Sequence, residues 1–280
     1  MTLPFAIAVA PNGARRTKAD HPRLPLTVAE MVREACAAQE AGAAMLHLHV
    51  RDATGRHVLD AGLYREALAA LRRELGERMV MQVTTEAVGR YGPAEQIALV
   101  RALWPESVSL ALRELFAEGE DEAAPAALIR EMEERGTLWQ LILYDAADLA
   151  RMEVLQSRGL LPDGPLAVLP VLGRYSGTGA DEAEFAAFLE AGIARHAFIL
   201  CAFGPEEARF MGLSALRGGH ARVGFENNLN LPNGGIAPNN AALVAACAEA
   251  AAASGRVLAD AADLRRIWRE PAPMPAEAGQ

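Results

Sequence analysis

Apolar and polar positions follow two alternating patterns along nearly the whole chain. Short apolar runs, which predict buried strands, are each followed by a longer segment whose apolar positions recur at helical spacing. Strands are predicted at residues 5–10, 44–50, 79–84, 107–112, 137–143, 166–172, 194–201 and 221–225. Helices are predicted at residues 27–41, 62–75, 122–135, 146–158, 181–191, 205–216 and 240–254, with another starting at Pro93 and a closing helix at about 259–268.

Local signals support where these helices start. Thr27 is followed three residues later by Glu30, which is the spacing of a capping box. Pro93 suits the first turn of a helix, where its missing N–H costs nothing. The alternation of strands and helices is therefore expected to reflect real elements.

Eight strand–helix units predict a parallel sheet. Eight units in a chain of 280 residues favour an α/β fold of the closed (β/α)8 TIM barrel type, with active residues at the carboxyl ends of the strands. The alternative is a doubly wound Rossmann sheet, but residues 10–15 lack the glycine fingerprint that would follow its first strand. We predict a single catalytic domain over residues 1–270 and a C-terminal tail over residues 271–280.

Composition and charge argue against several classes of function. The formal net charge of −9 argues against binding to a nucleic-acid backbone, which needs a basic surface. The three cysteines form no disulfide framework, and no apolar run is long enough to span a bilayer, so we expect a cytoplasmic protein without membrane or nucleic-acid partners. The chain has a single lysine, Lys18, so Schiff-base chemistry has only one candidate residue.

The sharpest chemical signal is the pair His47 and His49 at the end of the second predicted strand. Side chains two residues apart on a strand share a face, so both imidazoles point the same way with about 6 to 7 Å between Cα atoms. Such a pair suits zinc or another divalent transition metal. The alternative is two rim histidines that are hydrogen-bonded to their neighbours.

A third metal ligand is predicted at Glu226, which follows the eighth strand. In a closed barrel the eighth strand neighbours the first and the first neighbours the second, so Glu226 is expected near the histidine pair. Two histidines and one carboxylate are a common catalytic zinc set. The alternative is a rim carboxylate paired with Arg222 or Arg174.

Arginines near the predicted mouth point to an anionic ligand. Arg15, Arg51 and Arg222 fall at strand ends, and a buried guanidinium is costly unless it meets an anion such as a substrate carboxylate. An internal pair with Glu86, Glu114 or Asp52 is an equally weighted alternative. The remaining histidines lack comparable neighbours in the predicted fold and are expected to be structural or exposed: His21, His57, His196 and His220.

Four short motifs together resemble those of the β-keto acid cleavage enzyme family: residues 10–15 (APNGAR), 47–52 (HLHVRD), 82–85 (QVTT) and 223–226 (VGFE). The resemblance extends from residue 5 to about residue 254. It implies a zinc-dependent TIM barrel, in a homo-oligomer such as a dimer or tetramer, that condenses a β-keto acid with acetyl-CoA to give acetoacetate and an acyl-CoA.

Carried over residue by residue, the resemblance assigns roles to several positions. His47, His49 and Glu226 would bind the zinc ion, and Arg222 would lie near the reacting groups. Thr84 and, in a looser match, Ser109 would help to hold the substrate. Independently of the resemblance, their places near the predicted strand ends make four more residues candidates for substrate binding: Arg15, Arg51, Asn12 and Asn227. The candidates for the phosphates of coenzyme A are Arg15, Arg16, Arg90 and Arg174.

Two positions depart from the family prototype. An aspartate that is expected to act as the base is replaced by Asn227, and an acidic residue of the first loop, which binds an amino group, is replaced by Arg15. We therefore predict Glu86 as the catalytic base, with Glu114 as the second choice. The substrate is expected to be a β-keto acid whose distal part is neutral or anionic.

Two other functions are compatible with parts of this pattern. Metal-dependent barrel hydrolases also carry an H-x-H pair, but on the first strand and with further histidines on strands five and six. Here the predicted fifth and sixth strands, at residues 137–143 and 166–172, contain no histidine. The other alternative is a homologue that has lost activity and serves for binding, because Asn227 cannot accept a proton.

Overall fold

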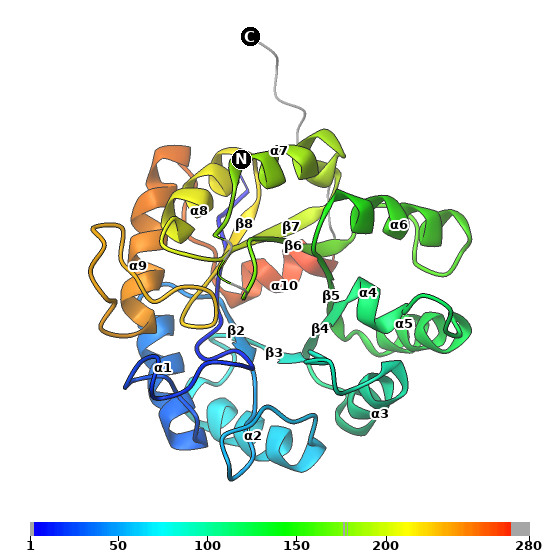
Figure 1. Ribbon diagram of the computed structural model, residues 1–280, viewed down its shortest axis with the longest axis horizontal. Coiled ribbons are helices and arrows are strands. Elements are labelled where there is room, and N and C mark those ends of the chain that lie inside the picture. The colour runs from blue at the N-terminus through cyan, green and yellow to red at the C-terminus, as the bar shows by residue number, and fades with distance from the viewer. Residues whose placement is uncertain (1–2, 176, 178, 270–280) are drawn as a thin grey trace.

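The strands close into a single parallel barrel in the order in which they occur along the chain. The computed structural model describes residues 3–175, 177 and 179–269. Figure 1 shows the strands at the centre with helices around them. The strands are β1 (Ile7–Val9), β2 (Met45–Leu48), β3 (Val80–Thr84), β4 (Ser107–Ala111), β5 (Leu138–Leu143), β6 (Ala167–Leu172), β7 (Ala197–Ala202) and β8 (His220–Val223).

The helices surround the barrel and alternate with its strands. The main ones are α1 (Val28–Glu40), α2 (Ala61–Leu75), α3 (Pro93–Leu103), α5 (Ala123–Arg135), α6 (Ala146–Ser157), α7 (Glu182–Glu190), α8 (Glu207–Leu216), α9 (Asn240–Ala251) and α10 (Ala261–Arg269). Short helical turns are α4 (Leu112–Leu115), η1 (Ile193–Arg195) and η2 (Ala252–Ser254).

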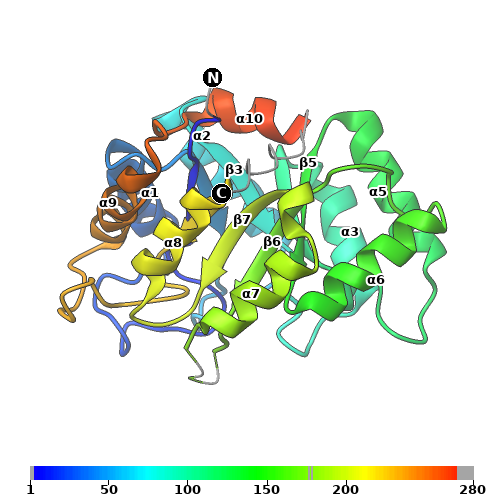
Figure 2. The ribbon, with the colours of Figure 1, turned by 90° about the horizontal axis from the view of Figure 1, so that it is seen from above.

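The barrel is sealed at the end where the strands begin. The interior is filled by small and branched side chains, and α10 adds Leu264, Ile267 and Trp268 to the same buried cluster. Figure 2 shows α10 lying across this end of the barrel. A second and larger apolar cluster lies between the strands and the surrounding helices. The carboxyl ends of the strands therefore form the open end.

The barrel that the sequence predicts is confirmed, and the doubly wound alternative is wrong. β1 pairs with β8, as in Ile7 opposite Ala221, and this pairing closes the sheet. The capping box of Thr27 and Glu30 is also present, with the Thr27 side chain accepting a hydrogen bond from Glu30 N. The predicted C-terminal tail, 271–280, lies outside the described residues.

The predicted and observed strand bounds differ by one to three residues, and at two strands the chain shows why. The first three residues of the predicted strand 194–201 belong to or follow η1, because the chain leaves α7 through Gly192 with φ of 90° and needs a turn before β7. The predicted strand 221–225 ends early, at Val223, because Gly224 has φ of 134° and breaks the extended path. Glu226 therefore lies in a turn and not on the strand.

Gly224 brings β8 into close contact with β1. A Cβ atom at this position would lie 2.5 Å from the carbonyl oxygen of Ala10, so no other residue fits without a shift of the backbone. The same carbonyl accepts a hydrogen bond from Glu226 N at 3.0 Å. This contact fixes the backbone of Glu226 against the first strand.

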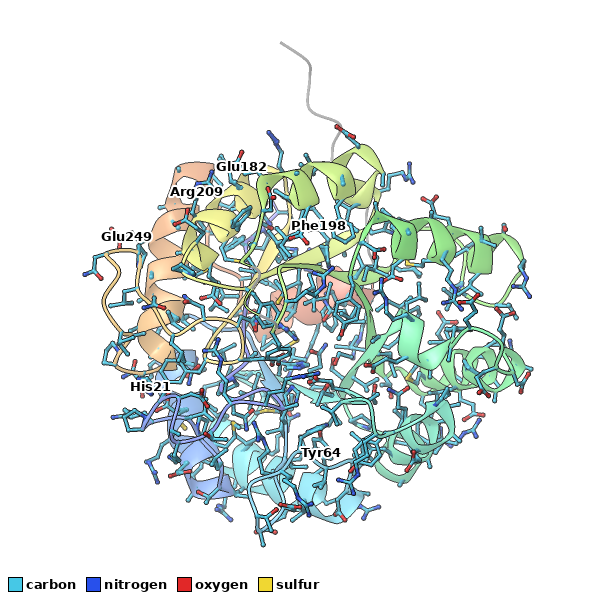
Figure 3. All side chains as sticks on the ribbon, in the orientation of Figure 1. His21, Tyr64, Glu182, Phe198, Arg209 and Glu249 are labelled. Carbon is cyan, nitrogen blue, oxygen red and sulfur yellow. The ribbon has the colours of Figure 1, made fainter. Side chains whose placement is uncertain are left out.

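One buried tyrosine ties the helical layer to the open end of the barrel. Tyr64 of α2, labelled in Figure 3, donates its hydroxyl to the carbonyl oxygens of Thr84 at 3.2 Å and Leu48 at 3.4 Å. Both carbonyls lie at the carboxyl ends of strands. Among the described helices, none combines the length and apolarity required to cross a bilayer.

Candidate active site

Three side chains converge at the open end of the barrel. His47 lies on β2, His49 lies one residue beyond it, and Glu226 lies in the turn after β8, and all three are buried. Their ligand atoms are close together: the two Nε2 atoms are 3.1 Å apart, and Glu226 Oε2 lies 3.3 Å from His49 Nε2 and 3.7 Å from His47 Nε2. The predicted grouping of these residues is confirmed.

The donor set fits a divalent metal ion. Ligand atoms about 2.1 Å from a tetrahedral zinc ion lie about 3.4 Å from one another, close to the three observed separations. Burial lowers the pKa of His47 to about 4, with a further contribution from the charge of Arg222, and burial lowers the pKa of His49 to about 3. Both imidazoles are thus neutral near pH 7, as metal ligands must be.

Glu226 divides its two oxygens between different partners. Oε1 accepts hydrogen bonds from the Tyr175 hydroxyl at 3.1 Å and from Arg222 Nη2 at 3.2 Å. Oε2 is buried and has no hydrogen-bond partner among the described residues. Burial opposes ionisation, but the positive charge of Arg222 holds the pKa of Glu226 well below its usual value. One oxygen is fixed and the other is available to a metal.

Two glutamines inside the barrel orient His47. His47 Nδ1 lies 2.7 Å from Gln82 Oε1, so it donates its proton there and leaves Nε2 free for a metal. Gln82 Nε2 donates to Gln140 Oε1 at 3.2 Å, and Gln140 in turn donates to the carbonyl oxygen of Val168. This chain of amides runs from β2 to β6 across the interior.

His47, His49 and Glu226 are called the metal group below. A cavity of about 380 Å³ opens from this group toward solvent. Apolar side chains from the ends of β4 to β7 form one wall, among them Ile142, Val171 and Phe203. Nine of the residues singled out in the sequence line this cavity: Arg15, His47, Thr84, Glu86, Ser109, Glu114, Arg174, Arg222 and Glu226. Ser109 Oγ is buried and has no partner among the described residues.

Glu86 is held beside the metal group by the loop that carries it. Its backbone N–H donates to Thr84 Oγ1 at 3.1 Å, and its carbonyl accepts from His57 Nε2 at 3.1 Å. Glu86 Oε2 lies 3.8 Å from His49 Nδ1. Burial, together with the negative charges of Glu226 and Glu114, raises the pKa of Glu86.

Glu114 supports this loop. Its Oε2 accepts hydrogen bonds from Ala87 N and from Gln96 Nε2, both at 3.0 Å. Burial raises the pKa of Glu114 against the opposing effect of these donors. Because Oε2 is already occupied, the catalytic role of Glu114 stays a weaker prediction than that of Glu86.

Three predicted substrate-binding residues lie outside the lining of this cavity. The Arg51 guanidinium donates to the carbonyl oxygens of Gly13, Arg16 and Gly55, and among the described residues it forms no ion pair with an acid. Asn12 Nδ2 donates to the carbonyls of Pro25 and His49. Both residues hold the loop after β1 in place.

Asn227 is the third predicted substrate-binding residue that lies outside the lining of the first cavity. Its Nδ2 atom donates to Cys201 Sγ at 2.7 Å, and its Oδ1 is buried without a partner in the described structure. It lines a second cavity of about 600 Å³, which adjoins the first because Arg15 and Tyr175 border both. Arg16 also lines this second cavity, and its Nη1 is likewise buried without a described partner.

The expectation that His57 lacks neighbours at the candidate ligands is wrong. His57 is buried, and its ring centroid lies 5.0 Å from that of His49, while its bond to the Glu86 carbonyl agrees with the expected structural role. An antiparallel bridge between Arg51 and His57 brings it there. The turn-forming residues 52–55 between Arg51 and His57 were the sequence signal that could have predicted this bridge. The other three histidines have structural contacts away from the cavity: His21 with Ala237 O, His196 with Leu166 N and His220 with Ala6 N.

Tyr175 was missed by the sequence analysis. It follows β6 in a loop, where neither strand phase nor a motif marks it. Arg15 and Tyr175 are in cation–π contact, with Cζ of Arg15 5.0 Å from the ring centroid. Lys18 pairs with Glu30 at 2.7 Å on the surface and does not line either cavity.

Comparison with known proteins adds independent information. A profile of the family described as beta-keto acid cleavage enzyme matches residues 4–269. The 3-keto-5-aminohexanoate cleavage enzyme of Fusobacterium nucleatum is 29% identical over 274 residues, covering 93% of this chain and 96% of that protein. The 3-oxoadipate:acetyl-CoA acetyltransferase of Cupriavidus necator is 29% identical over 275 residues, covering 95% of each chain.

Among solved structures, ObcA in its binary complex with oxaloacetate has a TM-score of 0.71. The two sequences are 16% identical, and the similarity covers 89% of this chain and 67% of that one. At this identity the similarity supports the barrel fold alone.

Proposed function

This chain belongs to the β-keto acid cleavage enzyme family, and from that premise we propose that it is a zinc-dependent enzyme that uses acetyl-CoA. It would convert a β-keto acid R–CO–CH2–COO⁻ and acetyl-CoA into acetoacetate and the thioester R–CO–SCoA. The observation that carries the proposal is the buried group of His47, His49 and Glu226, which opens into a cavity.

His47, His49 and Glu226 would hold the zinc ion. When bound, zinc supplies a Lewis acid that polarises the keto group of the substrate. Tyr175 and Arg222 fix Glu226 Oε1, and Gln82 fixes the tautomer of His47. These bonds hold the ligand atoms in place, so little reorganisation accompanies metal binding.

Substrate would be oriented by polar groups around the metal group. Ser109 Oγ is buried and unpaired among the described residues, and it faces the same cavity as Thr84. A buried hydroxyl without a partner is costly, so a substrate oxygen there would relieve that cost. Arg222 is also buried, lines the same cavity and would stabilise negative charge on the substrate.

Glu86 would move the proton that the exchange requires. Its carboxylate would take a proton from the carbon between the keto and carboxylate groups, and that carbon would form a bond to the acetyl carbonyl carbon while the thiolate leaves. The coenzyme A thiolate would then attack the keto carbon that carries R. The bond between this keto carbon and the newly acetylated carbon would break, which releases R–CO–SCoA. Glu86 would return its proton to that acetylated carbon, which gives acetoacetate. The proton is conserved and no oxidant or reductant is consumed.

The second cavity would admit acetyl-CoA. Arg16 lines it, and a guanidinium group suits the phosphates of coenzyme A. Acetyl-CoA appears in the name of the Cupriavidus necator relative, which supports this co-substrate. The hydrolase alternative has less support, because the matched family is one of C–C cleavage enzymes and β5 and β6 contribute no histidine.

The test is a product analysis with a metal-depleted control. Purified protein is assayed for bound metals and incubated with acetyl-CoA and a panel of β-keto acids, and products are identified by mass spectrometry. We expect about one zinc per chain, formation of acetoacetate with the matching acyl-CoA, and loss of both products after chelation. Free coenzyme A with no new thioester would instead indicate hydrolysis, and a metal-free active protein would contradict the zinc assignment.

A further inference from the structure

One arginine of the active-site cavity has no acidic partner in the described structure. Arg222 pairs with Glu226 at 3.2 Å, and Arg113 pairs with Asp145 at 2.8 Å and with Asp148 at 2.7 Å. Arg174 donates to three backbone carbonyls and lies 3.6 Å from Glu184. Among the residues that the structure describes, Arg15 forms no ion pair, although it lines the same cavity.

The position of Arg15 relative to the metal group is defined by a single side chain. The Tyr175 ring lies under the Arg15 guanidinium, with 5.0 Å between Cζ and the ring centroid, and the Tyr175 hydroxyl lies 3.1 Å from Glu226 Oε1. About one tyrosine side chain therefore separates the guanidinium from the carboxylate of a metal ligand. A short carbon chain bound at the metal group would span that distance.

We propose that Arg15 selects a β-keto dicarboxylate, by pairing with the carboxylate at the end distant from the keto group. The proposal rests on the proposed function, because it takes the proximal carboxylate and keto group to lie at the metal group. Stacking on Tyr175 restricts the guanidinium before substrate binds, which lowers the ordering cost of the ion pair. A monocarboxylate of the same length would leave Arg15 without this partner.

The location of Arg15 admits one competing role. It borders both cavities, so it could serve the phosphates of acetyl-CoA and not the β-keto acid. Kinetics separate the two, because loss of a substrate contact changes the discrimination between two β-keto acids. Loss of a coenzyme contact changes only the KM for acetyl-CoA.

The experiment compares a six-carbon β-keto dicarboxylate with the six-carbon β-keto monocarboxylate in the wild type, in Arg15→Gln and in Arg15→Lys. We expect the wild type to favour the dicarboxylate by about tenfold or more in kcat/KM, the range of one charge-assisted contact. Arg15→Gln should remove this preference, with little change for the monocarboxylate, and Arg15→Lys should restore part of it. Lys18→Gln, which removes a positive charge from the same loop, is the matched control and should behave as the wild type.

Two results would overturn the proposal. One is an unchanged preference in Arg15→Gln with a raised KM for acetyl-CoA, and the other is a wild type that favours the monocarboxylate. Calorimetric binding of the dicarboxylate to zinc-loaded protein without acetyl-CoA tests the inference apart from turnover. Binding that weakens about tenfold in Arg15→Gln would support Arg15 even if no acyl-CoA formed, whereas equal binding would contradict it whatever the turnover.

Discussion

His47 Nδ1 and Gln82 Oε1 are 2.7 Å apart, and this bond decides which nitrogen of His47 faces the cavity. An imidazole that donates through Nδ1 presents an unprotonated Nε2, the form that binds a metal. The Gln82 amide is itself fixed by Gln140 of β5, two strands away in the barrel. The position of this candidate ligand thus depends on side chains that are not candidate ligands themselves.

Replacing Gln82 should weaken metal binding without removing a ligand. We expect Gln82→Leu to lower zinc affinity by about 10- to 100-fold, because the orientation and tautomer of His47 are lost. Competition with a chromophoric chelator measures the affinity. Gln140→Leu, which leaves the bond between His47 and Gln82 in place, should lower it by less, and equal losses in the two variants would contradict this interpretation.

Replacing Glu86 should remove turnover and keep the metal. Glu86→Gln is close in shape but cannot accept the substrate proton, so we expect kcat to fall by about 100-fold or more with zinc content unchanged. Glu86→Asp keeps the carboxylate but moves it, so its kcat should lie between those of the wild type and Glu86→Gln. Full turnover of zinc-loaded Glu86→Gln would show that another group is the base.

Gly224→Ala should damage both stability and the metal group. The added Cβ would meet the Ala10 carbonyl at 2.5 Å, and the backbone already has φ of 134°, so we expect a loss of roughly 2 kcal/mol or more in the free energy of unfolding. Because Ala10 O also accepts from Glu226 N, zinc affinity should fall as well.

Gly76→Ala is the control for this substitution. Gly76 also has a positive φ, of 53°, but a Cβ there would meet nothing within 4 Å. It should lower stability moderately and leave zinc affinity unchanged. Denaturant titrations and chelator competition on both variants give the two readouts, and equal zinc affinity in Gly224→Ala and the wild type would contradict the prediction.

The stability of the fold should fall as pH drops below about 6.5. Burial lowers the pKa of His220 to about 3, so the unfolded chain binds a proton at this residue that the folded chain does not. Stability is therefore lost as pH falls from the unfolded pKa toward the folded one, by up to about 1.4 kcal/mol per pH unit for one histidine. His220→Gln should reduce the slope of unfolding free energy against pH between 6 and 4.5, and an unchanged slope would contradict the assignment.

The regular part of the structure was predictable from the sequence because it follows local periodicity. Period-two alternation placed His47 and His49 on one face, and the count of strand–helix units placed Glu226 beside them in a closed barrel. Glu226 was placed correctly even though its strand ends at Val223, because the turn at Gly224 keeps the chain against β1.

The loop residues were not predictable, because distant contacts decide where they point. Arg51 was expected to meet a substrate carboxylate or an acid, but it meets backbone carbonyls, a class of partner that sequence patterns do not reveal. Tyr175 and His57 reach the site through loops whose paths depend on the finished barrel. The family motifs distinguished Arg15 from the other arginines, but its contact with Tyr175 depends on the finished fold.

The ion pair between Lys18 and Glu30 has a consequence for the chemical durability of the protein. Thioesters acylate amines, whereas guanidinium groups stay protonated and are poor nucleophiles. The chain contains 27 basic residues in all, and Lys18 is the one lysine among them. Its ammonium group is engaged by Glu30 and by the carbonyl of Pro22. The side chains therefore offer a single amine as a target for acyl transfer from thioesters, and amine-reactive labels would mark them at one position in the loop after β1.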